Sequence, residues 1–388
     1  MSRVPPAAAA APPRAWTAAP GLWLLRGALL LAFFVPGVRE WFGAWHLRWI
    51  YLALLAFATA AFAVPIVRML AARWGVLDRP AARKVHAVAT PLLGGAAVYA
   101  AFATTVLFNF TFSLELKGVA VGATIVVLVG IVDDIMDIPA RAKLAGQVAG
   151  ALAAMLYGVV LNVVPQSVPG ATVLNLVLTV LWFLTVTNAL QFLDGMDGLA
   201  AGLGVIAGIF FSIAALQTHQ PYLMFLGAAL VGACVGFLPY NFRPGGATIF
   251  LGDSGASFVG FTLAGLAVMG EWSDNNPVVA LLTPSLILAV PLFDIAFVGV
   301  GRIVTGKVHS LQEWLAYTGK DHMHHRFEAL GLTKRQSVLL IFFIAATLGL
   351  SALLLKVSTP HEAALLLVQA ACVLAIIAVL EGVGRGRS

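Results

Sequence analysis

The chain has 388 residues, of which 61% are hydrophobic and only 10% are charged. A mean hydropathy of +0.96 excludes an ordinary soluble globular protein and predicts a membrane protein. The formal net charge of +6 is explained by basic loops beside anionic lipid headgroups and phosphate, so no nucleic-acid partner is expected.

The N-terminal region divides into a tail and an apolar stretch. Residues 1–20 are rich in Ala and Pro and cannot bury enough apolar surface to fold, so we expect a disordered tail. Residues 21–37 resemble a signal-peptide core, but no small-residue cleavage site follows them. We therefore expect an extra N-terminal helix and linker over 21–47, a single multi-spanning domain over 48–382 and a basic cytoplasmic tail over 383–388.

Apolar segments follow one another along the rest of the chain, and each is long enough, or nearly so, to cross a ~30 Å hydrocarbon core. The predicted core spans are 49–70, 92–110, 118–132, 144–163, 170–187, 198–217, 221–239, 253–270, 277–300, 336–356 and 362–381. The sequence thus predicts an all-α polytopic membrane protein with about 11 core transmembrane helices, or one more if the N-terminal stretch also crosses.

Basic residues are distributed unequally between alternate loops. One set of loops carries Arg68, Arg73, Arg79, Arg83, Lys84, Arg141, Lys143, Arg243, Arg302, Lys307, Lys320, Arg326, Lys334 and Arg335. The opposite side of the core has little beyond Arg48, Lys117 and Lys356. The positive-inside rule places the first set on the cytoplasmic face of the cell inner (plasma) membrane.

The first acidic motif is GIVDDIMDIPARAKLAGQ, in which Asp133, Asp134 and Asp137 end one span and Lys143 begins the next. Three carboxylates in five residues repel one another unless a cation or a phosphate-bound metal relieves them. If the helix continues, Asp133 and Asp137 share a face and Asp134 points elsewhere, which suggests a separate role for Asp134. The alternative interpretation is a solvated acidic loop.

The second motif is TNALQFLDGMDGLAAGL. Between residues 145 and 242 there is no Lys or Arg, and Asp194 and Asp197 are the only carboxylates. Charged groups against apolar spans are costly and usually mark a site, although helix-capping by the two acids is the alternative.

The third motif is NFRPGGATIFLGDSGASFVGF, which places Asn241, Phe250, Asp253 and Ser254 at another cytoplasmic helix start. Glycines around Asp253 permit close approach of the backbone to a phosphate, and a helix N-terminus favours anions. Ser254 lacks the flanking pattern of a nucleophile elbow.

The fourth motif is DHMHHRF, within the long loop 302–335. Its histidines and arginine can bind phosphate; zinc is the competitor, but no cysteines and no HExxH accompany them. A histidine tract without a role is the remaining alternative. Asp294, about two turns before Arg302, is expected either to pair with a neighbouring helix or to support the site.

Together, the strings RKVHAVATPLLGG, VDDIMD with Lys143, NALQFLDGMDGL, Asn241 with FLGDSG, PLFD and DHMHHRF resemble the polyprenyl-phosphate N-acetylhexosamine-1-phosphate transferase family (glycosyltransferase family 4; WecA, TagO and MraY) over residues 79–335. The resemblance is greater to the WecA and TagO branch, which uses UDP-GlcNAc, than to MraY, which uses UDP-MurNAc-pentapeptide. Two positions depart from the pattern: Gln191 stands where many relatives have Asn, so sugar or uridine selectivity can differ, and Ala256 replaces a serine.

The resemblance implies transfer of an N-acetylhexosamine 1-phosphate, GlcNAc-1-phosphate above all, from a UDP-N-acetylhexosamine to undecaprenyl or another polyprenyl phosphate. UMP leaves, and the product begins cell-surface glycan synthesis. A phospho-MurNAc-pentapeptide transferase and a secondary transporter are the alternatives, but clustering of the acids at one face favours catalysis over transport. A homodimer is left open.

The resemblance also implies the roles of residues. Asp253 and Asp194 would bind Mg²⁺ or Mn²⁺, and Asp133, Asp134 and Lys143 would join Asp253 as catalytic residues. The remaining expected ligands are, for uridine and sugar, Asn188, Asp194, Asp197, Asn241 and Phe250, and, for phosphates, Lys84, His86, His324, His325 and Arg326. Because a phosphate monoester is mostly a dianion at pH 7, positioning or metal binding by Asp133 and Asp134 is weighted as heavily as proton abstraction.

Overall fold

The computed structural model describes residues 20–79, 89–109, 113–273, 276–308 and 321–385. The elements are α1 (Pro20–Phe33), α2 (Pro36–Ala44), α3 (Arg48–Trp74), β1 (Leu77–Asp78), β2 (Thr90–Pro91), α4 (Gly94–Asn109), α5 (Leu114–Met136), α6 (Ala140–Leu156), α7 (Ala171–Leu193), α8 (Leu199–Gln217), α9 (Pro221–Asn241), α10 (Gly252–Met269), α11 (Pro277–Ile287), α12 (Ala289–Val304), α14 (Met323–Ala329), α15 (Lys334–Val357) and α16 (Pro360–Arg385).

The all-α polytopic prediction is confirmed, because long apolar helices dominate the described residues. Seven of these helices are long and apolar enough to cross a membrane: α3, α5, α7, α8, α9, α15 and α16. The number rises to nine if each of two bent pairs counts as one span, namely α1 with α2, bent by 61°, and α11 with α12, bent by 84°. Each of the eleven predicted core spans overlaps a helix or the second bent pair, although α6 ends at Leu156, before the predicted end at 163. Helices α4, α6 and α10 are shorter or less apolar than the other spans.

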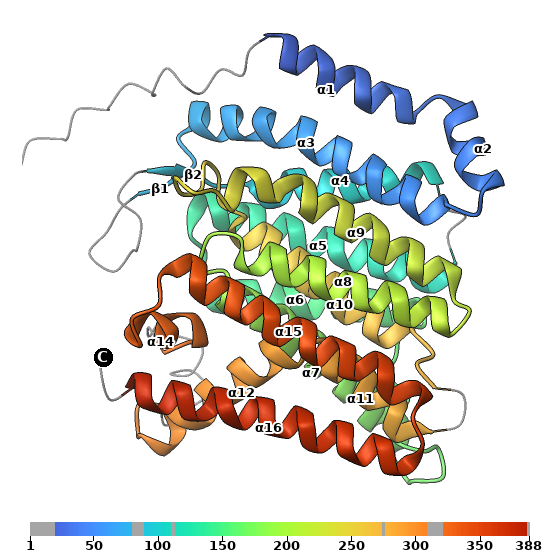
Figure 1. The fold of residues 1–388 in the computed structure, drawn as a ribbon, viewed down its shortest axis with the longest axis vertical. Coiled ribbons are helices and arrows are strands. Elements are labelled where there is room, and N and C mark those ends of the chain that lie inside the picture. Colours follow the sequence, from blue (N-terminus) through green and yellow to red (C-terminus); the bar gives the residue numbers. More distant parts are fainter. Residues whose placement is uncertain (1–19, 80–88, 110–112, 274–275, 309–320, 386–388) are drawn as a thin grey trace, which may run out of the picture.

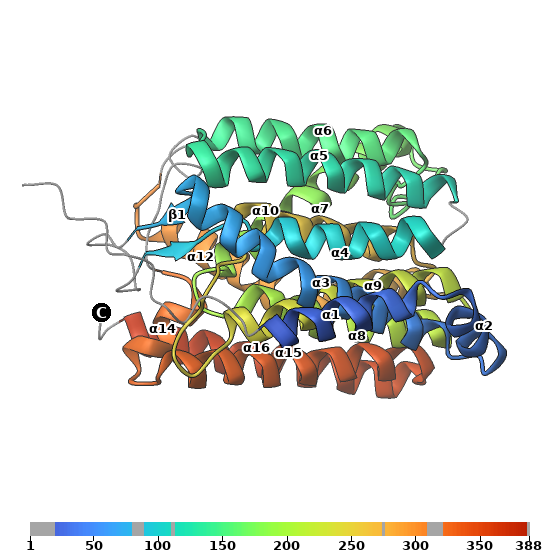
Figure 2. The ribbon, with the colours of Figure 1, turned by 90° about the horizontal axis from the view of Figure 1, so that it is seen from above.

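The helices lie side by side, with α10 among them in the interior (Figures 1 and 2). From Gly252 to Ala267 every residue of α10 except Asp253 is buried. Small residues allow this burial: a Cβ on Gly95 of α4 would lie 2.0 Å from the backbone nitrogen of Gly255, and one on Gly130 of α5 would lie 2.4 Å from the Cα of Ser254. Such contacts between backbones are typical of helix packing within membranes.

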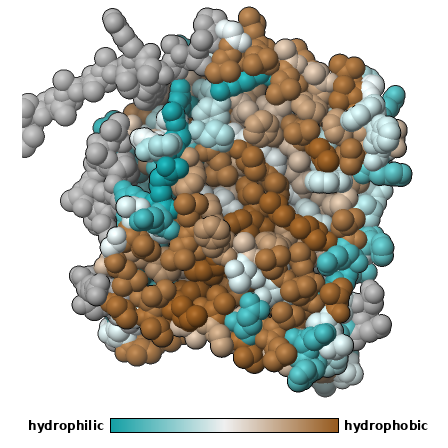
Figure 3. All heavy atoms as spheres, viewed as in Figure 1, coloured by the Kyte–Doolittle hydropathy of each residue, from teal (hydrophilic) through white to brown (hydrophobic). Residues whose placement is uncertain are grey.

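Apolar side chains cover much of the face seen in Figure 3, whereas hydrophilic ones gather mostly toward its left and right edges. Large apolar residues are exposed along helices such as α7, where Val173 is 64% exposed, and α16, where Val379 is 66% exposed. An apolar belt between two polar ends is the surface that a lipid bilayer requires. The chain is therefore a multi-pass membrane protein.

One polar end of the bundle collects the segments that carry the acidic and histidine motifs. The hairpin of β1 and β2 lies there, with Leu77 opposite Pro91 and Asp78 opposite Thr90, and α14 lies at the same end (Figures 1 and 2). The hairpin is joined to the segment that leads into α10, because the backbone nitrogen of Phe250 donates to the carbonyl of Pro91 at 2.8 Å. This end is where a site can form. Of the tail expected over 1–20, residues 1–19 lie outside the described residues, as do Lys84 and His86, whereas Pro20 begins α1.

Candidate active site

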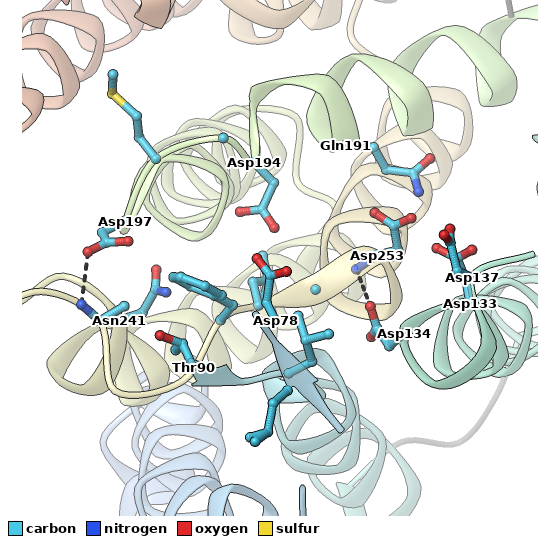
Figure 4. Close-up of a pocket in the computed structure, with 18 of the residues that line it drawn as sticks. Asp78, Thr90, Asp133, Asp134, Asp137, Gln191, Asp194, Asp197, Asn241 and Asp253 are labelled. Carbon is cyan, nitrogen blue, oxygen red and sulfur yellow. Dashed lines mark hydrogen bonds between the residues drawn. The ribbon is translucent and has the colours of Figure 1, made fainter. Parts of the chain in front are cut away.

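A cavity of about 1080 Å³ opens at this end of the bundle. Figure 4 shows that its walls come from segments far apart in the sequence. Its acidic lining residues are Asp78, Asp133, Asp134, Asp137, Asp194, Asp197 and Asp253. Lys143, His325 and Lys334 are its basic lining residues. A concave site with this density of carboxylates suits a ligand that brings cations or many hydrogen-bond donors.

Lys143 joins two of these carboxylates across three helices. Its Nζ lies 2.6 Å from Asp133 Oδ2, on α5, and 2.5 Å from Asp253 Oδ2, on α10. The other oxygen of Asp133 accepts from the backbone nitrogen of Ile138 at 3.0 Å, which fixes the turn between α5 and α6. One ammonium group thus offsets the repulsion between two acids that the sequence places 120 residues apart.

Asp134 does not share that bridge but caps the N-terminus of α10. Its Oδ1 accepts from the backbone nitrogen of Asp253 at 2.8 Å, and its Oδ2 accepts from the hydroxyl of Ser254 at 2.6 Å. Leu251, the N-cap residue, has no capping side chain of its own. Gly252 makes this approach available, because its φ is +75° and a Cβ there would lie 2.6 Å from Asp134 Oδ2. Asp134 therefore holds the backbone that carries Asp253.

A shared helical face for Asp133 and Asp137 would require α5 to continue through Asp137, but the helix ends before it. Helix α5 ends at Met136, and Asp137 is its C-cap in the left-handed region, with φ of 52°. The backbone nitrogen of Asp137 donates to the carbonyl of Asp133 at 2.9 Å. The chain turns here toward α6, and Asp137 reaches the cavity from the turn.

The carboxylates of the second motif lie in the turn between α7 and α8. Asp194 follows α7 and points into the cavity, toward the side where Asp253 and Asp78 lie (Figure 4). Burial, followed by the charges of Asp253, Asp134 and Asp197, raises the pKa of Asp194 well above its ordinary value. A cation bound beside Asp194 would relieve this repulsion and favour the ionised carboxylate.

Asp197 and Asn241 fasten the opposite wall. Asp197 Oδ2 accepts from the backbone nitrogen of Ala247 at 2.8 Å. Asn241 is 4% exposed; its Oδ1 accepts from Gly198 N at 2.6 Å and its Nδ2 donates to the carbonyl of Ile249 at 3.0 Å. Both ends of the Asn241 amide are therefore hydrogen-bonded within the wall. Phe250 also lines the cavity.

The histidine motif is held from behind by a buried polar network. Asp294 of α12 accepts from the backbone nitrogen of Met323 at 2.7 Å, and its other oxygen lies 2.7 Å from His322 Nδ1. Arg302 pairs with both oxygens of Asp321 at 2.8 and 2.7 Å. Burial raises the pKa of Asp321, but the hydrogen bond and charge of Arg302 outweigh it and leave that pKa below its ordinary value. The network fixes the N-terminus of α14, and Asp294 is thus paired with a neighbouring segment, which is one of the two expectations from the sequence.

His324 lies behind the cavity wall, against Gly195. It is 1% exposed, and a Cβ on Gly195 would lie 2.4 Å from its Nε2. Neither ring nitrogen has a hydrogen-bond partner among the described residues. Burial, and after it the neighbouring His325 and His322, lower the pKa of His324 well below its ordinary value. Burial therefore favours the neutral form of this imidazole.

The structure brings most of the expected site residues to one cavity. Those that line it are Asp133, Asp134, Lys143, Asp194, Asp197, Asn241, Phe250, Asp253 and His325. Asn188, His324 and Arg326 are not among the lining residues, and Lys84 and His86 lie outside the described part of the chain. Sequence reasoning missed Asp78, Thr90 and Lys334, which also line the cavity. Asp78 in β1 and Lys334 at the start of α15 lie close in sequence to basic residues that predict the cytoplasmic face, and that position was the signal available.

The chain is similar to proteins of known family. Residues 116–271 match the model of glycosyl transferase family 4. The chain is 33% identical over 313 residues to the probable undecaprenyl-phosphate N-acetylglucosaminyl 1-phosphate transferase of Bacillus subtilis, with 79% of this chain and 84% of the relative covered. It is also 33% identical over 358 residues to the decaprenyl-phosphate N-acetylglucosaminephosphotransferase of Mycolicibacterium smegmatis, with 84% and 86% covered.

A relative named for another substrate is matched over less of the chain. The phospho-N-acetylmuramoyl-pentapeptide-transferase of Desulforudis audaxviator is 33% identical over 183 residues, which is 45% of this chain and 49% of the relative. These similarities confirm the resemblance that the motifs predict. The chain belongs to glycosyl transferase family 4 and is a phosphoglycosyltransferase of the polyprenyl-phosphate group.

Proposed function

We propose that the protein transfers GlcNAc 1-phosphate from UDP-GlcNAc to a polyprenyl phosphate, yielding a polyprenyl-diphosphate-linked sugar and UMP. The observation that carries this proposal is the cavity at one end of the helix bundle, where Lys143 joins Asp133 to Asp253 beside Asp194. The names of the relatives matched over most of the chain support GlcNAc as the sugar.

The carboxylates of the cavity fit a divalent cation. Mg²⁺ is commonly bound through one or two protein carboxylates together with substrate phosphates. Asp253 and Asp194 both line the cavity and would hold Mg²⁺, or Mn²⁺ in its place. Among the described residues no group of three or more His, Cys, Asp or Glu could hold a metal ion, so the proposed ion would need further ligands from the diphosphate. When bound, the ion would draw negative charge from the diphosphate.

The reaction needs an oxygen of the lipid phosphate to attack the sugar-bearing phosphorus. That bond forms while the bond from this phosphorus to the bridging oxygen breaks, and the electron pair leaves with UMP. The attacking phosphate is mostly a dianion at pH 7, so no protein base is required. Lys143 keeps Asp133 and Asp253 in place, and Asp134 holds the start of α10.

Other lining residues would bind the two substrates. Phe250 would stack on the uracil, beside the wall that Asp197 and Asn241 fasten. His325 and Lys334 would contact phosphate oxygens as charge-assisted donors. The cavity end also carries the ends of α3, α6 and α15 with Arg73, Arg141 and Arg335, which supports a cytoplasmic active site in the inner membrane.

A transfer assay with the purified full chain tests the proposal. Radiolabelled UDP-GlcNAc and undecaprenyl phosphate are mixed with the protein and Mg²⁺, and the organic phase and UMP are measured. Equal amounts of lipid-linked label and UMP are expected. Absence of both, with label transferred instead from UDP-GalNAc or UDP-MurNAc-pentapeptide, would refute GlcNAc as the sugar.

A further inference from the structure

Three side-chain amides form a chain of hydrogen bonds that leads to the cavity. Gln147 of α6 is 4% exposed, and Asn188 and Gln191 lie one turn apart on α7. Asn188 Nδ2 donates to Gln147 Oε1 at 2.6 Å, and Gln147 Nε2 donates to Gln191 Oε1 at 2.8 Å. Gln191 lines the cavity, whereas Asn188 does not. This chain of hydrogen bonds therefore runs from the interior, between α6 and α7, to the cavity.

The direction of this chain is fixed at its inner end. Asn188 Nδ2 also donates to the backbone carbonyl of Leu184 at 2.7 Å, and a carbonyl can only accept. The nitrogen of Asn188 must then face Leu184 and Gln147, so the oxygen of Gln147 faces Asn188 and its nitrogen faces Gln191. Turning any one amide over would place two oxygens or two NH₂ groups against each other.

At the outer end of this chain of hydrogen bonds, the amide of Gln191 can therefore take only one orientation. The oxygen of Gln191 is taken by Gln147, and its nitrogen points to the side of the cavity where Asp253 lies (Figure 4). Gln147 and Gln191 both border the small cavity behind Asp133, Lys143 and Asp253. Gln191 thus presents an NH₂ donor beside the proposed reaction centre.

We infer that Gln147 is a positioning residue that sets the polarity of Gln191, so that Gln191 donates to an acceptor oxygen of the sugar nucleotide. This inference rests on the proposed function. The acceptor is a diphosphate oxygen or the acetamido oxygen of the sugar. Asn188, expected from the sequence to bind substrate, serves instead as the inner anchor, since both hydrogens of its amide are spent within the protein.

Replacing Gln147→Glu tests this inference, because a carboxylate has the same shape but can only accept. Asn188 still donates to it, but Gln191 must turn over to donate as well, and its oxygen then faces the acceptor on the substrate. We expect the KM for UDP-GlcNAc to rise at ~pH 8, by roughly 10- to 100-fold if the lost hydrogen bond is to a charged diphosphate oxygen and by roughly 2- to 10-fold if it is to the neutral acetamido oxygen. The KM for polyprenyl phosphate should stay unchanged.

A pH series separates this role from simple damage to packing. A protonated Glu has one O–H donor and one acceptor and so reproduces the pattern of Gln. Because burial at this 4% exposed position raises the pKa of the new carboxyl, lowering the pH from ~8 to ~5 should protonate it, and the ratio of the variant's KM to the wild-type KM should fall toward one. The charged groups that face position 147 are Asp133, Lys143 and Asp253, and they are the same in both proteins. Gln147→Met, which lacks both polar functions, should raise the KM without recovering at low pH.

Two further arms complete the experiment. Gln166→Glu makes the same chemical change on the exposed loop between α6 and α7 and should leave both KM values unchanged. Inhibition by UDP and by UDP-glucose identifies the acceptor: weaker inhibition by both in Gln147→Glu indicates the diphosphate, and unchanged inhibition with a raised KM for UDP-GlcNAc indicates the acetamido group.

The inference is overturned if Gln147→Glu keeps the wild-type KM at ~pH 8, or if Gln147→Met recovers at low pH as Glu does. If the Glu variant does not fold, an unchanged KM in the Met variant overturns it equally. Wild-type protein that forms no lipid-linked GlcNAc would refute the proposed function itself, which is a separate outcome.

Discussion

The acidic cluster on α5, α6 and α10 and the histidine segment around α14 use their charged residues differently. In the acidic cluster, Lys143, Asp133 and Asp253 pair with one another while lining the cavity. In the histidine segment, buried side chains pair behind the wall, and of the motif only His325 lines the cavity. A dense run of charged residues can therefore either line the cavity itself or hold in place the segment behind the cavity wall. Substitutions in the first region should affect turnover most, and those in the second should affect stability.

The largest effect is expected from Asp253→Asn, which removes the negative charge that Lys143 and the proposed cation share. We expect kcat to fall by roughly 1,000-fold or more, as when a group that stabilises transition-state charge is lost. Transfer of label to lipid measures this, and thermal unfolding should change little. Turnover near the wild-type rate would exclude Asp253 from the chemistry.

Removal of divalent metal should also abolish transfer. Chelation by EDTA removes the cation that Asp253 and Asp194 are proposed to hold, and added Mg²⁺ should restore the rate. The rate is measured as UMP release against free Mg²⁺ concentration. Full activity in excess EDTA would contradict the assignment of a metal to these two carboxylates.

The histidine segment should respond through stability. Arg302→Met leaves the buried Asp321 without the cation that pairs with both of its oxygens, and breaking a buried pair costs about 3–5 kcal/mol. We expect a lower Tm in detergent together with partial loss of transfer. An unchanged Tm with a large fall in kcat would place Arg302 with the acidic cluster instead.

Asp134→Ala should show an effect of both kinds, since Asp134 caps α10 and so positions Asp253. Loss of a cap costs about 0.5–2 kcal/mol of stability. Displacement of Asp253 should in addition lower kcat by roughly 10-fold or more relative to the wild type. Ser113→Ala is a matched control, because Ser113 caps α5 by accepting from Leu116 N at 3.2 Å, away from the cavity. Equal kinetics in the two variants would remove the positioning role.

The smallest effect concerns His324. Because its pKa is lowered in the folded state, the unfolded chain gains a proton near pH 6.5 that the folded chain does not, and stability should fall as the pH drops below this value. The slope for one proton is about 1.4 kcal/mol per pH unit. His324→Phe should flatten this part of the Tm profile. A profile of unchanged slope would mean that His324 is not held neutral.

Much of the fold was predictable because apolar length is set by the bilayer, and every predicted core span contains a helix. The meeting of distant acids was also predictable, since an unequal distribution of Lys and Arg puts their loops on one side. What could not be predicted is the partner of each side chain. Spacing shows that Asp134 turns away from Asp133, but not that it caps a helix 119 residues further along the chain.

The same limit applies to Asn188, His324 and Asn241. Their residue types are typical of ligands, but the partners of their side chains could not be predicted from the sequence. Their neighbours come from other helices: Gln147 meets Asn188, Gly195 meets His324, and Asn241 binds Gly198. Only packing decides whether such a side chain faces the cavity or the protein interior. For Asp78 and Lys334 the sequence offers only their place among basic residues, and this does not distinguish a side chain that lines the cavity from an ordinary surface charge.

Transfer by oriented membrane vesicles tests the central proposal most directly. Radiolabelled UDP-GlcNAc is supplied outside sealed inverted vesicles and outside right-side-out vesicles that contain the protein. We expect organic-soluble label and UMP with the inverted vesicles alone, and neither with Asp253→Asn. Label that accumulates as intact sugar nucleotide in the lumen, or equal transfer by the Asp253→Asn protein, would contradict a cytoplasmic transferase centred on this cavity.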